Sequence, residues 1–335
     1  MEYRLHEWIA KKDLASTSTD QLVSRFKRWL RNKSNSDIQE ILMTALIPDD
    51  YEEDGEREKL FTRLVETVIG ETFRRIGFRV KLMKSKTDTE DVQITTASKT
   101  ILVDAKTFRL GRSQIAPNVK DFIKLHTFRT WISNYNLLHK KSQAIGGLIV
   151  YPSTHEWVRQ SQVYKKCSDK ETPVVMMPFE VLCYLLKEKR RFKPEDLLEL
   201  WDYETLYPHP VVTRTDYWQV MTAAIARILR RPLEEVLMEL EAFHLFYEEA
   251  VLEACRRIRV KIAKVLREVP ETIGKMSEAE VRKNLETLLI RTETARLLEA
   301  DKNIHKNRKI FLPDEISNQM PSLKVSPESD LISCL

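Results

Sequence analysis

Residues 91–106 read DVQITTASKTILVDAK and decide the fold. Two segments in this stretch, 92–96 and 100–104, are rich in β-branched and apolar residues, which favour extended backbone. The short polar sequence between them, 97–99, is typical of a turn. The pattern therefore predicts two neighbouring strands joined by a tight connection.

Charged residues occupy the same end of both predicted strands. Side chains alternate between the two faces of a strand, so Asp104 and Lys106 are expected on one face, with Val103 and Ala105 directed into the core. If the turn folds one strand back on the other, Asp91 returns to the end of the sheet that carries Asp104. The sequence thus predicts two acids and one lysine at a single sheet edge.

The flanking sequence predicts helices and further strands around this pair. A helix is expected over 56–75, where apolar residues form one stripe and Gly77 follows as a cap. A second helix is expected over 119–134. Additional strands are expected at 78–82, 146–151 and 174–177. This order predicts an α/β fold, a mixed sheet flanked by helices, with helices before it and a large helical region after it.

Four regions follow from these patterns. Residues 1–50 are predicted to form an N-terminal helical region and 51–192 the core. A helical region is predicted over 193–311, including a helix from Leu233 to Ile262 and another over 279–298. Its expected role is dimerisation or enclosing the DNA. The tail 312–335, with its prolines among polar residues, is predicted to be disordered.

Composition excludes several classes of protein. The 335 residues include 55 Lys plus Arg against 50 Asp plus Glu, so any surface for nucleic acid must be a local basic patch. Only seven glycines occur, without a phosphate-binding loop motif, so no nucleotide cofactor is expected. The longest apolar run, 144–151, is too short to cross a membrane. Four unpaired cysteines and the polar N-terminus favour a cytoplasmic location.

Asp91 and Asp104 are the candidate ligands for a divalent metal ion. Mg²⁺ prefers carboxylate and carbonyl oxygens, which these two side chains and the backbone carbonyl of Ala105 would offer. Lys106 would position the attacking water or neutralise charge that develops on a phosphate. The alternative is an exposed strand end that carries an ordinary salt bridge.

A basic stretch follows the predicted site and is the candidate DNA-binding segment. Its cationic and hydrogen-bonding side chains suit contacts to phosphates and base edges. A solvated helix face is the alternative interpretation. The candidate residues are Arg109, Arg112, Ser113, Gln114, Asn118, Lys120 and Lys124.

Other acids compete for places at the metal site. Glu66 and Glu71 lie on the predicted helix before the sheet, and Glu66 is the preferred third acid because it borders the apolar stripe; a solvated glutamate is the alternative. Asp88 and Glu90 are rivals of Asp91 within three residues of it. His126 and His139 lack a second ligand at suitable spacing and are not expected to be catalytic.

The combination resembles the HindIII family of type II restriction endonucleases, which belong to the PD-(D/E)XK nucleases. The likeness is densest over 104–112 and 120–122 and recurs at 58–61 and 151–154, although Glu90 stands where the motif has proline. It implies a PD-(D/E)XK core, with Asp91 and Asp104 as metal ligands and Lys106 as the catalytic lysine.

The resemblance also implies an activity. A member of this family hydrolyses double-stranded DNA as a homodimer with Mg²⁺, or Mn²⁺ as a substitute, and leaves 5′-phosphate ends at a palindrome such as AAGCTT. Two alternatives remain open from the sequence. One is a structure-specific repair or recombination nuclease of the same fold, and the other is a DNA-binding protein without catalytic activity.

Overall fold

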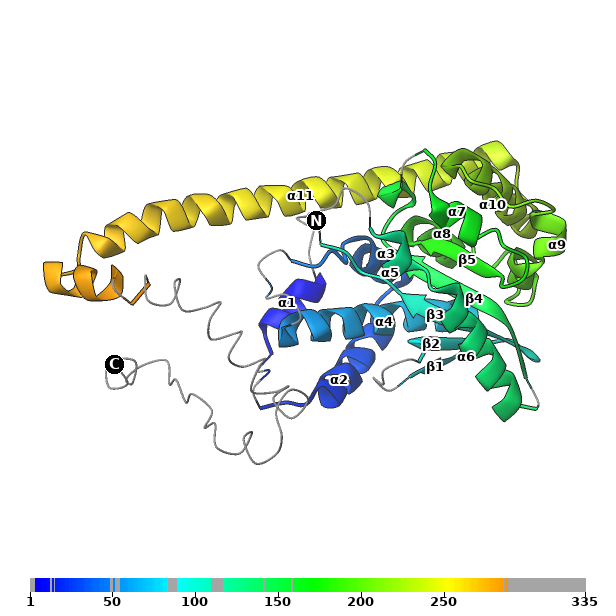
Figure 1. Ribbon diagram of the computed structural model, residues 1–335, viewed down its shortest axis with the longest axis horizontal. Helices are drawn as coiled ribbons and strands as arrows, with labels where there is room; N and C mark the ends of the chain where they lie inside the picture. Colours follow the sequence, from blue (N-terminus) through cyan, green and yellow to red (C-terminus); the bar gives the residue numbers. More distant parts are fainter. Residues whose placement is uncertain are drawn as a thin grey trace, which may run out of the picture. The chain divides into compact units, whose positions relative to one another are not determined.

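The computed structural model describes residues 4–12, 14, 16–48, 51, 55–83, 89–109, 117–140, 142–157, 159–285 and 287–288 (Figure 1). The chain divides into two units after Ile258. The sheet and both sites discussed below belong to the first unit. The predicted disordered tail, 312–335, lies outside the described residues, and the predicted region boundaries remain predictions.

A five-stranded mixed sheet forms the centre of the first unit, as the sequence predicts. The first three strands pair antiparallel, and the third, fourth and fifth pair parallel. In spatial order, which is also chain order, they are β1 (Arg79–Leu82), β2 (Val92–Thr95), β3 (Lys99–Ala105), β4 (Gln143–Tyr151) and β5 (Val174–Pro178).

The β2–β3 hairpin has the register that the sequence pattern requires. Val92 pairs with Val103, and Ile94 pairs with Ile101. These four side chains are fully buried, as is Leu102 between the two on β3. Burial of consecutive residues shows that β3 is covered on both faces, which is expected of a central strand in an α/β sheet.

Helices from before and after the hairpin cover the sheet (Figure 1). α4 (Glu56–Ile76) contacts β1, β2 and β3, and α6 (Leu125–Leu138) contacts β3 and β4. The predicted cap is confirmed: Gly77 has φ of 121° and its N–H donates to the Phe73 and Arg74 carbonyls. Such a positive φ strains residues with a side chain, which explains the glycine.

The predicted helix over 119–134 is wrong in one respect, because the chain leaves the helix in the middle. α5 (Val119–Phe122) ends before Ile123, whose backbone is extended, and α6 begins at Leu125. The break allows the buried Phe122 ring to pack on Trp157, with ring centroids 4.2 Å apart. Tertiary aromatic packing therefore overrides a helical pattern that is continuous in the local sequence.

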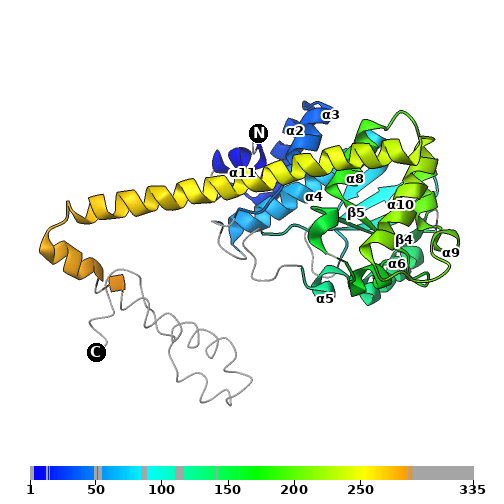
Figure 2. The same cartoon turned by 90° about the horizontal axis from the view of Figure 1, so that it is seen from above.

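The remaining helices precede and follow the core. α8 (Phe179–Lys187) lies directly after β5 and packs beside it (Figure 2). The predicted helix from Leu233 to Ile262 is confirmed as part of α11 (Leu233–Ile273), and the described residues 279–285 are helical. None of the described helices has the length and apolarity that a membrane crossing requires. The helices that precede and follow the core are α1 (Arg4–Ala10), α2 (Thr19–Arg31), α3 (Asn35–Met43), η1 (Thr154–Glu156), α7 (Gln162–Lys166), α8 (Phe179–Lys187), η2 (Asp196–Trp201), α9 (Tyr203–Leu206), α10 (Arg214–Leu229) and α11 (Leu233–Ile273).

Gly146 on β4 permits a close approach of neighbouring segments. A Cβ atom there would lie 2.5 Å from the Pro173 carbonyl oxygen and 2.5 Å from Cδ1 of Trp201. We expect Gly146→Ala to lower the free energy of unfolding by about 2 kcal/mol, because the backbone carbonyl cannot move aside freely. Urea denaturation measures this. Gly70→Ala in α4, whose Cβ would meet only side chains, is the control and should be nearly neutral; equal effects would contradict the packing argument.

Candidate active site

The hairpin register brings Asp91 and Asp104 together. Asp91 directly precedes Val92, which pairs with Val103, and the backbone N–H of Asp91 donates to the Val103 carbonyl at 2.9 Å. Oδ2 of Asp91 accepts the N–H of Ala105 at 2.8 Å. The first predicted acid is thus fixed to the end of the strand that carries the second.

Lys106 lies beside Asp104, as strand alternation predicts. Its Nζ is 2.9 Å from Oδ2 of Asp104, with side-chain exposures of 26% for the lysine and 15% for the aspartate. The backbone N–H of Lys106 donates to the Val150 carbonyl of β4 at 2.8 Å, which holds the residue against the sheet. The ammonium group is therefore fixed at the acid pair and remains partly open to solvent.

α4 adds Glu66, the preferred third acid, to this cluster. Glu66 is buried and forms an ion pair with Arg63, which also donates to the Met83 carbonyl. Arg63 is not among the residues predicted from the sequence, although its spacing of three residues from Glu66 on a helix indicates an ion pair. Glu71 lies elsewhere, in ion pairs with Arg74 and Arg75.

The other rival acids have different surroundings. Glu90 is buried and accepts a hydrogen bond from Nε2 of Gln93 at 2.5 Å. This contact occupies one of its carboxylate oxygens. Asp88 lies outside the described residues.

The three clustered acids are incompletely neutralised. Burial raises the pKa of Asp91 well above its usual range, and the carboxylates of Glu66 and Asp104 raise it further. Burial likewise raises the pKa of Asp104, against the opposing effect of Lys106. It also raises the pKa of Glu66, although Arg63 acts in the opposite direction. Ionised carboxylates at this site therefore lack sufficient positive charge.

This arrangement fits a hard divalent cation. Oxygen ligands from two adjacent acids, in a partly exposed position next to a third buried acid, match the preferences of Mg²⁺. A cation would supply the positive charge that the raised pKa values show to be lacking. Asp91 and Asp104 are the residues that would hold it. The assignment of the Ala105 carbonyl as a further ligand remains a prediction.

The metal-free protein should lose stability as the pH rises. Because the pKa of Asp91 is higher in the folded than in the unfolded state, stability is fully present below the ordinary carboxyl pKa of about 4 and is lost as pH rises through the folded value. Asp91→Asn removes this titration, so in EDTA its free energy of unfolding should fall less than that of the wild type. Urea denaturation at several pH values measures the difference, and a gap that does not change with pH would contradict this account.

The structure describes only part of the predicted DNA-binding segment. Lys120 and Lys124 are exposed, and Lys124 contributes to the electrostatics of Asp104. Asn118 caps α5, because its Oδ1 accepts the Lys120 N–H at 3.0 Å. Arg112, Ser113 and Gln114 lie outside the described residues. For all of these residues DNA binding remains a prediction.

Arg109 makes structural contacts instead of presenting a free guanidinium group. Its Nη2 lies 2.8 Å from Oε2 of Glu58, and its Nε donates to Oε1 of the same carboxylate at 3.2 Å. Nη1 donates to the Tyr51 carbonyl at 2.7 Å and the Pro48 carbonyl at 3.2 Å. Arg109 thereby joins the end of β3 to the start of α4, and its predicted role on DNA is untested.

Replacing Arg109 should affect stability first. We expect Arg109→Ala to lower the free energy of unfolding by about 2 kcal/mol, because it removes a half-buried ion pair with Glu58 and two hydrogen bonds to backbone carbonyls. Arg227→Ala removes a more exposed ion pair with Glu199 and should cost less than about 1 kcal/mol. Urea denaturation compares the two. Loss of DNA affinity at unchanged stability would show that Arg109 acts on DNA instead.

His126 and His139, the two histidines considered as catalytic candidates from the sequence, contact neighbouring residues of α6. His126 is exposed, and its Nε2 is 3.3 Å from Oγ1 of Thr127. His139 stacks on Tyr135, with ring centroids 4.1 Å apart. These contacts are to Thr127 and Tyr135, and the absence of a catalytic role for the two histidines remains a prediction.

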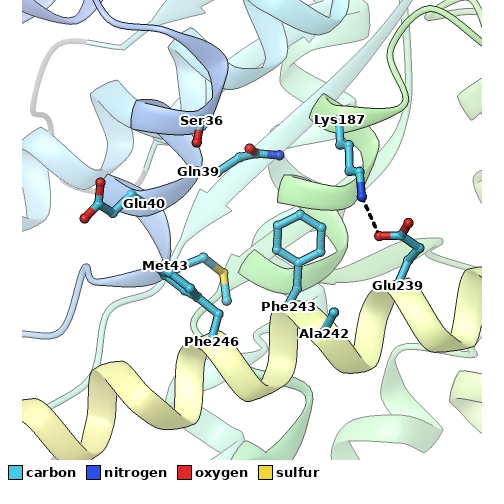
Figure 3. A pocket seen from close by; sticks show the side chains of 9 residues that line it. All are labelled: Ser36, Gln39, Glu40, Met43, Lys187, Glu239, Ala242, Phe243 and Phe246. Carbon is cyan, nitrogen blue, oxygen red and sulfur yellow. Dashed lines mark hydrogen bonds and ion pairs between the residues drawn. The ribbon is translucent and has the colours of Figure 1, made fainter. Parts of the chain in front are cut away.

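A cavity of about 300 Å³ lies between α3, α8 and α11 (Figure 3). Met43, Phe243 and Phe246 supply much of its apolar lining, and Lys187 and Glu239 form an ion pair of 2.6 Å at its side. Its lining includes none of the predicted site residues. The cavity is therefore separate from the acid cluster.

The mixed sheet with flanking helices is a restriction-endonuclease-like α/β fold. The family model of the HindIII restriction endonuclease matches residues 6–282, and the chain belongs to this family. No curated protein matches the sequence.

One similar solved structure is the small subunit of the heterodimeric restriction endonuclease R.BspD6I. It is 13% identical, with a TM-score of 0.37 over 58% of this chain and 99% of that chain. Because this TM-score is low, the family assignment rests on the family model alone.

Proposed function

We propose that this restriction endonuclease is a type II enzyme that hydrolyses double-stranded DNA at a palindrome such as AAGCTT and leaves 5′-phosphate ends. The observation that supports this most is the cluster of Asp91, Asp104 and Lys106 at one sheet edge. Membership of the HindIII family supplies the reaction and the substrate class. The predicted homodimer would place one such cluster at each strand of the duplex.

In this proposal Asp91 and Asp104 hold Mg²⁺, with Mn²⁺ as a substitute, and the Ala105 carbonyl is a further ligand. The bound ion would supply Lewis-acid activation of the scissile phosphate. Lys106 orients the attacking water and stabilises the negative charge that develops on the phosphate. Glu66, whose counter-ion is Arg63, adds its negative charge to that of the acid pair and so favours the bound cation.

The proposed DNA contacts follow the active site along the chain. Lys120 in α5 and Lys124 just before α6 are exposed cations, and Lys124 acts electrostatically on Asp104. We assign them to phosphate contacts, together with Arg112, Ser113, Gln114 and Asn118 for phosphates or base edges. The helical region 193–311 would support dimerisation or embrace the DNA.

Digestion of a plasmid of known sequence with Mg²⁺, followed by sequencing of the ends, tests this proposal. Discrete fragments with 5′-phosphate ends at one palindrome are expected, and none in EDTA. Cleavage confined to flaps or junctions would identify a structure-specific nuclease instead. Salt-dependent DNA binding without any nicking would identify a non-catalytic DNA-binding protein.

A further inference from the structure

Two imidazoles and a carboxylate converge outside the acid cluster. His155 lies on η1 after β4, Glu180 lies in the first turn of α8 after β5, and His244 lies on α11. One potential ligand atom from each residue lies within 4.8 Å of the other two. The two imidazole ring centroids are 3.8 Å apart.

Glu180 has a buried oxygen that lacks a partner. The residue is only 2% exposed, and its Oε1 accepts from Oγ of Ser153 at 2.6 Å and lies 3.3 Å from Nδ1 of His244. Its Oε2 is buried without a hydrogen-bond partner among the described residues. A buried carboxylate oxygen without a donor is costly, and a bound cation would offset that cost.

Neighbouring groups hold the three residues in place. Nε2 of His244 lies 3.2 Å from Oε1 of Glu248, which leaves Nδ1 directed to Glu180. Ser153, which donates to Glu180, also accepts the backbone N–H of His155 at 3.3 Å. A carboxylate on the far nitrogen of a histidine and a hydroxyl on a ligating carboxylate are typical supports of a metal site.

We propose that His155, Glu180 and His244 bind a transition metal ion of the Zn²⁺ type. Two nitrogens and one carboxylate oxygen suit Zn²⁺, whereas Mg²⁺ prefers an all-oxygen set. The ion would join the segments after β4 and β5 to α11 and so stabilise this part of the fold. The site shares no residue with the acid cluster, and this inference does not depend on the proposed cleavage.

Zn²⁺ binding to the full-length protein tests the inference. Equilibrium dialysis of the metal-stripped protein against Zn²⁺, with Mg²⁺ in large excess to occupy the acid cluster, should give one Zn²⁺ per chain. The same addition should raise the melting temperature. His155→Gln, a change at an exposed residue that should not impair folding, is expected to weaken Zn²⁺ binding at least about tenfold and to remove most of the thermal shift.

His209→Gln is the matched control, because this histidine is exposed and lies outside the cluster. It should bind Zn²⁺ as the wild type does. Equal Zn²⁺ affinity in His155→Gln and the wild type would overturn the proposal. Absence of Zn²⁺ binding by the wild type would overturn it as well. The three residues would then form only the hydrogen-bonded contact between His244 and Glu180, with His155 beside it.

Discussion

Asp104→Asn is expected to reduce Mg²⁺-dependent cleavage at least about 10³-fold, because it removes a charged metal ligand from the proposed site and the partner of Lys106. The fold should survive, since asparagine has nearly the same size and its carbonyl oxygen can still accept from the lysine. Single-turnover cleavage of a plasmid that carries the recognised site measures the loss, and circular dichroism checks the fold.

The matched control for this change is Asp20→Asn. Asp20 is an exposed residue near the start of α2, and its replacement should leave cleavage within about twofold of the wild type. DNA affinity measured without metal should be preserved in both variants or increase in Asp104→Asn, where a negative charge is lost. Cleavage by Asp104→Asn at the wild-type rate would remove this acid from the mechanism.

Lys106→Met is expected to lower the cleavage rate at least about 10²-fold at saturating DNA, because it removes the ammonium group that is paired with Asp104 in the proposed site. Methionine keeps the length and apolar stem of lysine, so packing against the sheet should remain. The distinctive expectation is a loss in the rate of the chemical step with little change in DNA affinity, measured by rapid-quench cleavage and by equilibrium binding.

Lys99→Met is the control for Lys106→Met, since Lys99 begins β3 whereas Lys106 follows the other end of that strand. Its Nζ interacts with Oε1 of Gln143 at 2.6 Å, away from the acids. Removal of its charge should leave the cleavage rate unchanged. A variant of Lys106 that lost DNA affinity but retained the rate of the chemical step would show that this lysine only attracts the duplex.

The part of the site on the β2–β3 hairpin could be predicted because its information is local. Strand alternation and a short turn place Asp91, Asp104 and Lys106 on one edge without knowledge of the rest of the chain. The cap at Gly77 is equally local. Each feature depends on residues within one short stretch of sequence, where periodicity is informative.

The features that the sequence did not reveal depend on distant partners. Arg109 is held by Glu58 and by carbonyls of residues 48 and 51, and no spacing rule connects these positions. The break after Phe122 depends on Trp157. The cluster of His155, Glu180 and His244 combines three single residues from separate elements, so no motif could indicate it.

The pairing of β2 with β3 restricts how this protein can change over evolution. Insertion or deletion of one residue within either strand would shift the register that brings Asp91 and Asp104 to the same end of the hairpin, which would inactivate the enzyme in one event. Loops outside the hairpin carry no such restriction on length. Divergence toward new target sequences is therefore expected through loop remodelling, while the reaction chemistry stays tied to an uninterrupted pair of strands.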